Sequence, residues 1–590
     1  MRSAIEKKYE VVVVGGGLSG VCAAIASARH GAKTAIIQNR PVFGGNASSE
    51  IRMHVCGAAG IYCTRKNSRE TGIIEEILLE NKKRNPNHSF SIFDTVLWEK
   101  INFQDNLDKY LNTQMYGVEI ADGTILSIKA EQITTEKKYV FKAGIFIDAT
   151  GDGTLAEQAG ADYMIGREGK RVYGEPHAPD IDDCKTMGNS LMFKTVDTGH
   201  HVSFKPPAWA KRYTEEDLRY RCHKQVSSGY WWIELGGDDL NVIDDYETIR
   251  DELLKVVYGI WDHIKNGGAH EADTLDLDWV QFLPGKRESR RILGEYVLKE
   301  QDLLKGRAFP DTIAYGGWPI DTHAASGMSN LHSEPTKYIF LDDVYSIPYR
   351  CLIPKKLDNL LVAGRAVSAS HLAFASLRVM GTTSVIGQAA GTAAALQTAG
   401  KQPVRSLYGN IKELQQTLLR DGCYLPGILN EDENDLAREA AVTASSCQEG
   451  YEPSAVINGL NRPVKDHENC WKSSIGKVNG QWLQMQWEQP VKMDMMQITF
   501  DSDLNEDLMI TLERDIIEQR RRTLPGSLAE SFKVQLFMGG LLVAEKQITG
   551  NSIRNPKIQW EKSITADKAR IIFNAAYECD QITVFEVRIY

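Results

Sequence analysis

The stretch that decides the fold is "YEVVVVGGGLSGVCAAIASARHGAKTAIIQNR", residues 9–40. An apolar run at residues 11–14 is followed by Gly15-x-Gly17-x-x-Gly20, an Ala-rich helical stretch that closes at Gly31, and a second apolar run. In such a unit the first glycine permits the tight turn, the second lets the backbone approach a phosphate, and the third lets helix and strand pack closely. The helix also offers free N–H groups at its N-terminus. The sequence therefore predicts a dinucleotide-binding βαβ unit.

The second strand ends in Gln38, where such units usually carry a carboxylate for the ribose. The amide oxygen of Gln38 can accept a ribose hydroxyl, but a neutral hydrogen bond contributes about 0.5–1.5 kcal/mol and a bond to a charged group about 1.5–3 kcal/mol. We therefore expect weaker binding there, and we expect Gln38→Glu to tighten it by about 1 kcal/mol. The next residue, Asn39, is a second candidate for this contact.

Length and composition narrow the class of protein. A chain of 590 residues exceeds the size of a single core, so we expect several domains. Hydrophobic residues at 42% and charged residues at 25% are typical of a soluble globular protein. A net charge of -10 argues against nucleic-acid binding, and no apolar window is long enough to span a membrane. The sequence as given shows no export signal, which leaves the compartment open: cytoplasmic, or periplasmic if a leader was removed.

Changes in texture along the chain predict four segments. Residues 1–165 and 341–430 alternate Gly- and Ala-rich turns with apolar strands, as in α/β layers. Residues 166–340 look like an inserted α+β substrate or cap domain, with an amphipathic helix over residues 244–266. Residues 433–590 read as short alternating strands with a hairpin at Gly539-Gly540. The predicted fold class is a Rossmann-like α/β domain with an inserted α+β domain, followed by an all-β jelly-roll sandwich.

Three further stretches indicate which dinucleotide binds. They are "PVFGGNASSEIRMHVCGAAG" at residues 41–60, "AGIFIDATGDGTLAEQAGA" at residues 143–161, and "LDNLLVAGRAVSASHLAFASLRVMGTTSVIGQAAGTAAAL" at residues 357–396. With the glycine turn, these resemble the FAD-dependent oxidoreductases of the glutathione-reductase-like flavoprotein group over about residues 9–425. An extended FAD is too long for one βα turn, so distant strands must return to contact it. The resemblance thus implies FAD as the cofactor, and we expect it to be held noncovalently.

The resemblance assigns parts of the cofactor to particular residues. It implies that residues 44–46 lie along the pyrophosphate, that residues 149–152 lie near a ribose and phosphate, and that the helix opening at Met380 points its positive end at the flavin. The complete set of implied FAD-binding residues is Gly15, Gly17, Leu18, Ser19, Gly20, Gln38, Asn39, Arg40, Gly44, Gly45, Asn46, Met115, Ala149, Thr150, Gly151, Asp152, Gly364, Arg365, Arg378, Gly381 and Thr382.

The C-terminal module carries a second resemblance. "SAVINGLNRPVKDHENCWKSS" at residues 454–474, followed by "QWLQMQWEQPVKMDMMQITFD" at residues 481–501, resembles the coagulation-factor type C, or discoidin-like, β-sandwich. The resemblance implies either a glycan-binding module or a structural appendage. The Arg520-Arg521-Arg522 run inside this module is expected to lie in a solvated loop.

Histidine is the natural base for flavin-dependent oxidation near neutral pH. We rank His371 first because it lies in the loop between the return strand and the flavin-facing helix, with a structural role as the equal alternative. His54 and His323 are further candidates, the alternatives being a core histidine and a turn. Arg291, with its neighbours Arg287 and Arg290, could hold a carboxylate or the flavin, or pair with Glu288 or Glu295.

Cysteines, paired histidines and paired tryptophans are further candidates for functional residues. Cys56 near His54 could be a redox thiol, although buried cysteines are usually inert. His200-His201 has no partner at ligand spacing and the ten cysteines form no CxxC pair, so we expect no metal site. Trp231 and Trp232 could form the floor of a sugar-sized pocket, or belong to the core.

These observations favour an FAD-dependent oxidoreductase that oxidises an alcohol group of a carbohydrate or related small molecule by hydride transfer to flavin N5. Two alternatives stay open. One is a flavoprotein reductase fed by NAD(P)H, against which the lack of a second GxGxxG unit counts. The other is a glycan-binding protein with a vestigial flavin site. The expected partner is a small molecule, with a glycan at the C-terminal module as a further option.

Overall fold

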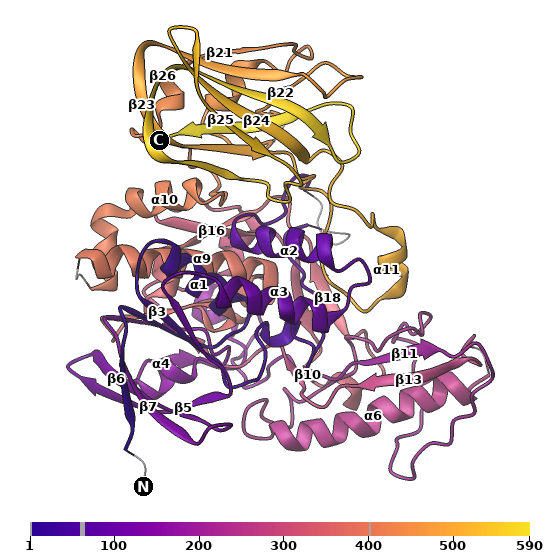
Figure 1. Cartoon of the computed structure of the whole chain (residues 1–590). Coiled ribbons are helices and arrows are strands. Elements are labelled where there is room, and N and C mark those ends of the chain that lie inside the picture. Colours follow the sequence, from indigo (N-terminus) through magenta and orange to yellow (C-terminus); the bar gives the residue numbers. More distant parts are fainter. Residues whose placement is uncertain (1–2, 60–64, 269, 401–402, 466) are drawn as a thin grey trace. The chain divides into compact units, whose positions relative to one another are not determined.

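The computed structural model describes residues 3–59, 65–268, 270–400, 403–465 and 467–590 (Figure 1). The chain divides into two compact units. The first unit comprises Met1–Thr64, Asn87–Leu414 and Met509–Arg520, and the second comprises Arg65–Pro86, Gln415–Leu508 and Arg521–Tyr590. Residues 65–86 therefore belong to the second unit although the chain on both sides belongs to the first, and residues 509–520 belong to the first unit although the chain on both sides belongs to the second. The last residue of the quoted stretch 41–60 lies outside the described residues.

A parallel sheet forms the centre of the first unit. Within the described residues its strand order is β20-β8-β2-β3-β4, and every neighbouring pair is parallel. All four residues of β2, β3 and β8 are buried, which is expected of strands covered on both faces. The bounds are β2 Val11–Val14, β3 Thr34–Ile37, β4 Leu107–Tyr110, β8 Ile145–Asp148 and β20 Leu360–Val362.

A second sheet packs against the first through a shared apolar core. Its order is β1-β7-β6-β5 in the described part of the chain, with β1 parallel to β7 and the other pairs antiparallel. Val12 and Val14 of the parallel sheet belong to the same buried cluster as Ile128 and Phe141 of the second sheet. The bounds are β1 Ile5–Lys8, β5 Thr113–Ala121, β6 Thr124–Gln132 and β7 Lys137–Lys142.

The helix of the βαβ unit, α1, packs on the long small-residue helix α9. A Cβ at Gly387 would overlap the backbone oxygen of Ser19, and one at Gly391 would overlap that of Ala23. These glycines therefore set how closely the two helices approach. The helix bounds in and around this layer are α1 Leu18–Arg29, α3 Phe90–Asn102, α4 Thr154–Gln158, α8 His371–Leu377, α9 Met380–Gly400 and α10 Ile411–Arg420.

The inserted region has its own core, built on the amphipathic helix predicted at residues 244–266. That helix is α6, Tyr246–Asn266, seen as a long helix in Figure 1. Its predicted apolar positions are all buried, and Trp261 packs on Phe193 of β11 with ring centroids 5.8 Å apart. β11 Phe193–Asp197 pairs antiparallel with β13 Leu275–Val280. The amphipathic prediction is confirmed.

Short elements complete the first unit. β10 pairs with β12 and β14, β9 with β15, β16 with β19, and β17 with β18, all antiparallel. Their bounds are β9 Tyr163–Met164, β10 Asn189–Ser190, β12 Glu234–Leu235, β14 Gly285–Lys286, β15 Arg291–Ile292, β16 Thr312–Gly316, β17 Ile320–His323, β18 Thr336–Ile339, β19 Tyr345–Pro348, α5 Lys170–Tyr173, α7 Glu300–Leu304 and α11 Arg514–Gln519.

The second unit is an antiparallel β-sandwich together with helix α2. Its core includes Trp471, Leu483, Val534 and Ile571. The long strands β23 and β26 pair with two interruptions of register, and such irregularities let strands bend. The predicted hairpin is β24–β25, which turns at residues 539–540. The bounds are α2 Ile73–Arg84, β21 Ala441–Ala444, β22 Trp471–Lys472, β23 Trp482–Phe500, β24 Ala529–Met538, β25 Leu541–Ile548, β26 Lys557–Ala576 and β27 Thr583–Ile589.

The predicted fold class, a parallel α/β domain followed by an antiparallel sandwich, is confirmed. The compact units divide the chain less simply than the four predicted segments, because residues 65–86 join the sandwich and residues 509–520 join the first unit. In the predicted loop at residues 520–522, Arg521 and Arg522 are exposed, and Arg520 donates to the Met509 carbonyl at 2.7 Å. Among the described residues, no helix combines the length and apolar character needed to cross a membrane.

Candidate functional site

The glycine turn after β2 has the geometry that its sequence predicts. Gly15 has φ +108°, and a Cβ there would overlap the Ala149 carbonyl, while one at Gly20 would overlap the Gly15 carbonyl. Gly17 differs, because a Cβ there would meet nothing within 4 Å among the described residues. Two glycines therefore allow close packing, and the third leaves open space at the N-terminus of α1 for a phosphate group.

Gln38 holds this turn from the neighbouring strand. Its Oε1 accepts the Gly16 N–H at 2.9 Å, and its Nε2 donates to the Val42 carbonyl at 3.2 Å. The side chain is buried, so both ends of the amide are engaged inside the protein. The ribose contact of Gln38 stays a prediction, and the partner seen in the structure is the glycine turn itself.

A second glycine loop lies directly against the first. Gly17 and Gly44 form a parallel bridge, and the Gly44 N–H donates to the Gly16 carbonyl at 2.8 Å. A Cβ at Gly45 would lie 3.1 Å from the Gly17 Cα. Asn46 Nδ2 donates to the Lys286 carbonyl at 2.9 Å, which ties this loop to β14. The two loops thus form one surface around the open space at Gly17.

The motif after β8 supplies charge to the same surface. Asp152 accepts from Arg365 Nη2 at 2.8 Å and from Lys286 Nζ at 2.6 Å. Burial would raise the pKa of Asp152, but the charges of Arg365 and Lys286 hold it well below its ordinary value. Arg290 donates to the Asp152 carbonyl at 3.4 Å. Two cations therefore pair with the Asp152 carboxylate and a third contacts its backbone carbonyl, and the excess positive charge suits a pyrophosphate.

Buried donors near the turn lack partners. Ser19 Oγ and Arg365 Nε have no hydrogen-bond partner within the described residues, and a Cβ at Gly364 would lie 3.7 Å from the Ser19 hydroxyl. Such groups are rarely left unsatisfied in native proteins. Together with the open space at Gly17 and the excess charge, they fit a dinucleotide with its phosphate and ribose oxygens. The first N–H groups of α9 are partly engaged, since Gly381 donates to the Cys56 carbonyl at 2.7 Å.

His371, the first-ranked base, opens α8 and is held by a carboxylate. Its Nδ1 lies 3.0 Å from Glu288 Oε1, and its backbone N–H donates to Glu168 at 2.8 Å. Burial would raise the pKa of Glu288, but attraction to His371 and Arg291 and the hydrogen bonds that Glu288 accepts hold the pKa below its ordinary value. Because an ionised carboxylate accepts, Nδ1 carries the proton of a neutral ring, and Nε2 is then the basic nitrogen.

Arg291 is fully buried and committed to acidic and carbonyl partners. It pairs with Glu168 at 2.9 Å and with Glu288 at 3.4 Å, and it donates to the carbonyls of Ala369 and Gly166. The predicted alternative, an ion pair with Glu288, describes this arginine in the structure. Arg291 therefore helps to hold the Glu288 carboxylate that contacts His371.

His323 lies between two carboxylates. Its Nδ1 is 2.7 Å from Glu234 and its Nε2 is 3.3 Å from Asp321. Arg378 pairs with Asp321 at 3.0 Å, and Arg287 pairs with Glu234 at 3.5 Å. Burial would raise the pKa of Asp321, but the charges of His323 and Arg378 hold it well below its ordinary value. Both ring nitrogens have acidic partners, so His323 is held between Glu234 and Asp321 and positions both carboxylates.

The two histidine networks lie side by side because consecutive backbone groups bind their carboxylates. The Met187 N–H donates to Glu288 at 2.9 Å, and the Gly188 N–H donates to Glu234 at 2.6 Å. Residues 286–288 connect the whole arrangement, because Lys286 contacts Asp152, Arg287 contacts Glu234, and Glu288 contacts His371. One short segment thus joins the surface around Gly17 to both histidines.

His54 contacts the segment that joins the first unit from the C-terminal region. Its Nδ1 lies 3.2 Å from Thr511 Oγ1, and its Nε2 lies 3.6 Å from Glu513. Cys56 Sγ lies 3.8 Å from the Met509 sulfur. The ring of His54 is largely buried, so its contacts resemble the core-histidine alternative. A role for it at the flavin stays a prediction.

Some predicted site residues lie apart from this surface. Asn39 is exposed and donates to Gln114 at 3.1 Å, Arg40 pairs with Glu50 at 3.2 Å, and Met115 is buried in the core between the two sheets. Trp232 is also buried and stacks on Tyr230, which supports the core interpretation for that residue. No motif in the sequence assigned a role to Lys286 or Glu234. The position of Lys286 beside the Arg287–Arg291 run was the available signal, whereas no spacing marks Glu234.

Three comparisons relate the chain to known proteins. The family described as FAD dependent oxidoreductase matches residues 10–418, and a domain of unknown function, DUF7402, matches residues 435–510. No curated protein matches the chain.

Among solved structures, the family 32 CBM from C. perfringens NanJ in complex with galactose is 14% identical, covers 26% of this chain and 97% of its own, and has a TM-score of 0.20. A Streptococcus pneumoniae fucose binding module, SpX-3, is 14% identical, covers 26% of this chain and 96% of its own, and has a TM-score of 0.20. A chitosan-binding module from Paenibacillus sp. IK-5 is 17% identical, covers 26% of this chain and 98% of its own, and has a TM-score of 0.20. These values assign no ligand to the sandwich. The match over residues 10–418 covers most of the chain and includes the glycine turn, the second glycine loop and both return motifs, and the chain therefore belongs to the FAD-dependent oxidoreductase family.

Proposed function

We propose that the protein oxidises an alcohol group of a carbohydrate or related small molecule, with His371 as the general base. The observation that carries the proposal is the bond between His371 Nδ1 and the buried Glu288 carboxylate at 3.0 Å. A carboxylate in this position orients the ring and stabilises the imidazolium that forms when Nε2 takes a proton. The histidine and its carboxylate thus supply the proton-accepting half of an alcohol oxidation.

Bound FAD supplies the hydride acceptor at flavin N5. The hydroxyl proton of the substrate passes to His371 Nε2 as the carbon–oxygen double bond forms, and the hydride leaves the same carbon, so the two electrons and the proton are accounted for. Glu288 stays ionised throughout, and Arg291 behind it keeps the carboxylate in place.

The His323 network supports binding of a polar substrate beside this base. Two arginines and two carboxylates surround His323 in this network: Arg287, Arg378, Glu234 and Asp321. Trp231 packs edge-on against His323, with ring centroids 5.4 Å apart, and Arg287 donates to its carbonyl at 2.6 Å. An aromatic ring beside hydrogen-bonding groups suits a sugar, which has both hydroxyls and apolar ring faces. This combination favours a carbohydrate over an apolar alcohol.

The test is anaerobic bleaching of the bound flavin by a panel of sugars and polyols. The reductive rate with the best substrate should fall by about 10²–10⁴-fold in His371→Gln. His332→Gln changes an exposed histidine and is the matched control, with an unchanged rate expected. Retained flavin absorbance would show that the variant is folded and loaded. An unchanged rate in a loaded His371→Gln protein would contradict the role of this base.

Two outcomes would replace the proposal. Bleaching by NADPH with no response to any sugar or polyol would favour a flavoprotein reductase. A flavin that neither donor bleaches, in a protein that binds glycans, would favour a binding protein with a vestigial flavin. Glu288→Gln adds a finer readout: it removes the carboxylate that stabilises the imidazolium of His371, so the reductive rate should fall while the flavin stays bound.

A further inference from the structure

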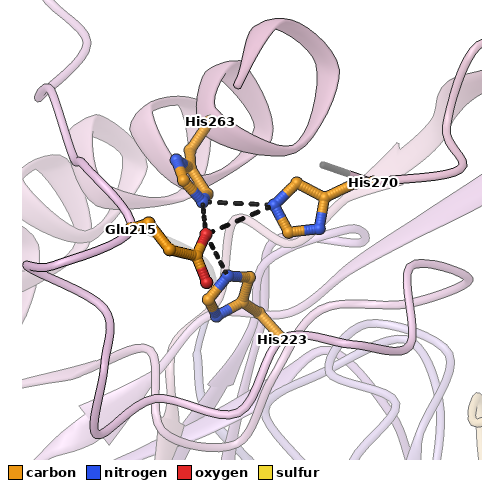
Figure 2. Close-up of side chains that lie close together, drawn as sticks. All are labelled: Glu215, His223, His263 and His270. Atoms are coloured by element: carbon orange, nitrogen blue, oxygen red, sulfur yellow. Dashed lines mark hydrogen bonds and ion pairs between the residues drawn. The ribbon is translucent and has the colours of Figure 1, made fainter. Parts of the chain in front are cut away.

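Four potential metal ligands converge in the inserted region. Glu215, His223, His263 and His270 each offer one ligand atom, and these atoms all lie within 4.8 Å of one another (Figure 2). Glu215 Oε2 is 3.1 Å from His263 Nε2, 3.4 Å from His223 Nε2 and 3.9 Å from His270 Nε2. The Nε2 atoms of His263 and His270 are 3.2 Å apart. Three imidazole nitrogens and one carboxylate oxygen therefore face a common centre.

These spacings match a tetrahedral metal site. Zinc binds imidazole nitrogen at about 2.0–2.1 Å and carboxylate oxygen at about 2.0–2.2 Å, so neighbouring ligands of a tetrahedral ion lie about 3.3–3.5 Å apart. The four separations given above, from 3.1 to 3.9 Å, lie around this value. The three imidazole rings also surround the centre evenly, with centroids 5.0, 5.0 and 5.2 Å apart.

The orientation of His223 is fixed by a contact outside the cluster. Its Nδ1 donates to the Arg221 carbonyl, which leaves the Nε2 lone pair directed at the centre. A hydrogen bond from the remote ring nitrogen to a backbone carbonyl is the usual device that orients metal-binding histidines. Arg221 is itself anchored by the carbonyls of Ser333 and Asn330, at 2.6 and 3.1 Å. This ligand is therefore preorganised before any ion binds.

Hydrogen bonding alone satisfies this cluster poorly. A neutral imidazole has one N–H, and His223 uses its own on Arg221, so its Nε2 has no proton to give to Glu215. His263 and His270 present Nε2 atoms to each other and to the same oxygen, although a hydrogen bond between the two nitrogens needs a proton from one of them. A dication at the centre would use all of these lone pairs at once.

We propose that Glu215, His223, His263 and His270 bind one zinc ion in a structural site. Four protein ligands complete a tetrahedron and leave no position for substrate, which distinguishes structural from catalytic zinc. His263 belongs to the last turn of α6 and His270 follows that helix, while Glu215 and His223 lie in the irregular chain between β11 and β12. The ion therefore fastens this irregular chain to the end of α6.

The burial pattern suits reversible loading. His223 and His263 are buried, His270 is half-buried, and Glu215 is exposed. The carboxylate can swing aside to admit the ion while the histidines stay in place. Since His263 ends the helix whose apolar face forms the core of the inserted region, we expect the ion to stabilise that region without taking part in flavin chemistry.

The test measures metal on the full-length, FAD-loaded protein. After removal of bound metal with a chelator, zinc sulfate alone is titrated, and the zinc retained per chain and the thermal melting temperature are recorded. We expect one equivalent of zinc and a rise in melting temperature. Cobalt(II) in place of zinc should give the strong visible absorption of a tetrahedral site.

Glu215→Gln and His223→Gln should each weaken zinc binding at least about ten-fold. His201→Gln changes an exposed histidine of the same region and is the matched control, with binding unchanged. Glu215 is exposed, so its replacement leaves the fold intact even if a variant of buried His223 does not fold. Flavin absorbance and circular dichroism identify folded variants. A wild-type protein that retains no zinc, or a folded Glu215→Gln protein that binds zinc as tightly as wild type, would overturn the proposal.

Discussion

Gln38 shows how one side chain can support a glycine turn through its own hydrogen bonds. From the sequence, its amide stands in for the usual ribose-binding carboxylate. In the structure the oxygen accepts the Gly16 N–H and the nitrogen donates to the Val42 carbonyl, so a neutral amide satisfies one donor and one acceptor together. A carboxylate could satisfy only the first of these.

This geometry reverses the effect expected for Gln38→Glu. The second carboxylate oxygen would face the Val42 carbonyl, so two buried acceptors would lie together with no donor between them. An unsatisfied buried acceptor costs about 1–3 kcal/mol, whereas the stronger hydrogen bond from the Gly16 N–H would contribute at most about 1.5 kcal/mol. We predict FAD binding about two- to ten-fold weaker, measured by equilibrium titration of the apoproteins. Asn39→Asp adds the same charge at an exposed neighbour and should change affinity little. If the Gln38→Glu protein bound FAD five-fold more tightly than wild type, the predicted contact of residue 38 with the ribose would be supported instead.

Asp94 is a second residue whose chemistry follows from its surroundings. It accepts the Ser49 N–H at 3.1 Å, just after the second glycine loop, and burial raises its pKa to about 6 despite this bond. An unfolded aspartate titrates near 3.8. The folded state therefore holds the proton more tightly, and this group lowers the free energy of unfolding as the pH rises from about 4 to about 6.

Asp94→Asn should remove that pH dependence while keeping an acceptor for Ser49. At about 1.4 kcal/mol for each pH unit between the two pKa values, the gain in stability at pH 7 is at most about 3 kcal/mol. Denaturant unfolding at pH 4, 5, 6 and 7 measures it, with the exposed Asp105→Asn as control. Parallel pH profiles for Asp94→Asn and wild type would show that Asp94 titrates normally.

At the scale of elements, the packing of α1 on α9 depends on glycines. Gly391 and Gly387 lie where helix backbones approach so closely that a methyl group would overlap a carbonyl of α1. Because α1 begins at the phosphate-binding turn, any displacement of this pair moves the turn. The small-residue pattern of α9 therefore helps to fix the position of the glycine turn.

Gly391→Ala tests this packing. The new Cβ meets rigid backbone at Ala23, so we predict a loss of stability at or above about 3 kcal/mol, with weaker FAD retention. Gly409→Ala is the matched control, because a Cβ there meets nothing within 4 Å among the described residues. Thermal melting and the flavin content of both purified variants give the comparison. Equal melting of the two proteins would mean that the helices can separate freely.

The sequence predicted regular elements well and contacts between remote segments poorly. The valine run of β2, the amphipathic α6 and the β24–β25 hairpin follow from local periodicity and turn residues. Glu234 and the four proposed zinc ligands could not be found that way, since residues 215 and 270 meet only through tertiary folding. Motif spacing marked Asp152 and Arg365, but Lys286, the second cation that pairs with Asp152, comes from the inserted region.

At the scale of the whole molecule, the sandwich unit depends on a segment from far upstream. Arg69 is buried, pairs with Glu75 at 2.6 Å and donates to the Ser502 hydroxyl at 2.9 Å. Arg462, also buried, donates to Thr71 at 2.9 Å. Residues 65–86 thus complete a unit whose other parts begin at residue 415.

This dependence bears on whether residues 433–590, the predicted all-β segment, can fold alone. Their apolar core is self-contained, so the fragment should melt cooperatively, but it lacks the partners of Ser502 and Arg462. We predict that a peptide of residues 65–86 added in trans raises its melting temperature by several degrees, where about 1 kcal/mol corresponds to about 2–4 °C at this size. A peptide carrying Arg69→Ala is the control. No shift with the native peptide would mean that the segment docks only as part of the continuous chain.

The exchange of segments between the units also sets an order of events during synthesis. The first unit includes residues 509–520, so the growing chain cannot complete it when residue 414 leaves the ribosome. Roughly 100 further residues must be translated, which takes about 5–20 seconds at ordinary elongation rates. In that interval the nascent flavin domain lacks residues 509–520, the segment that contacts His54 and Cys56. The first unit is therefore completed late in synthesis, even though the glycine turn is among the first residues made.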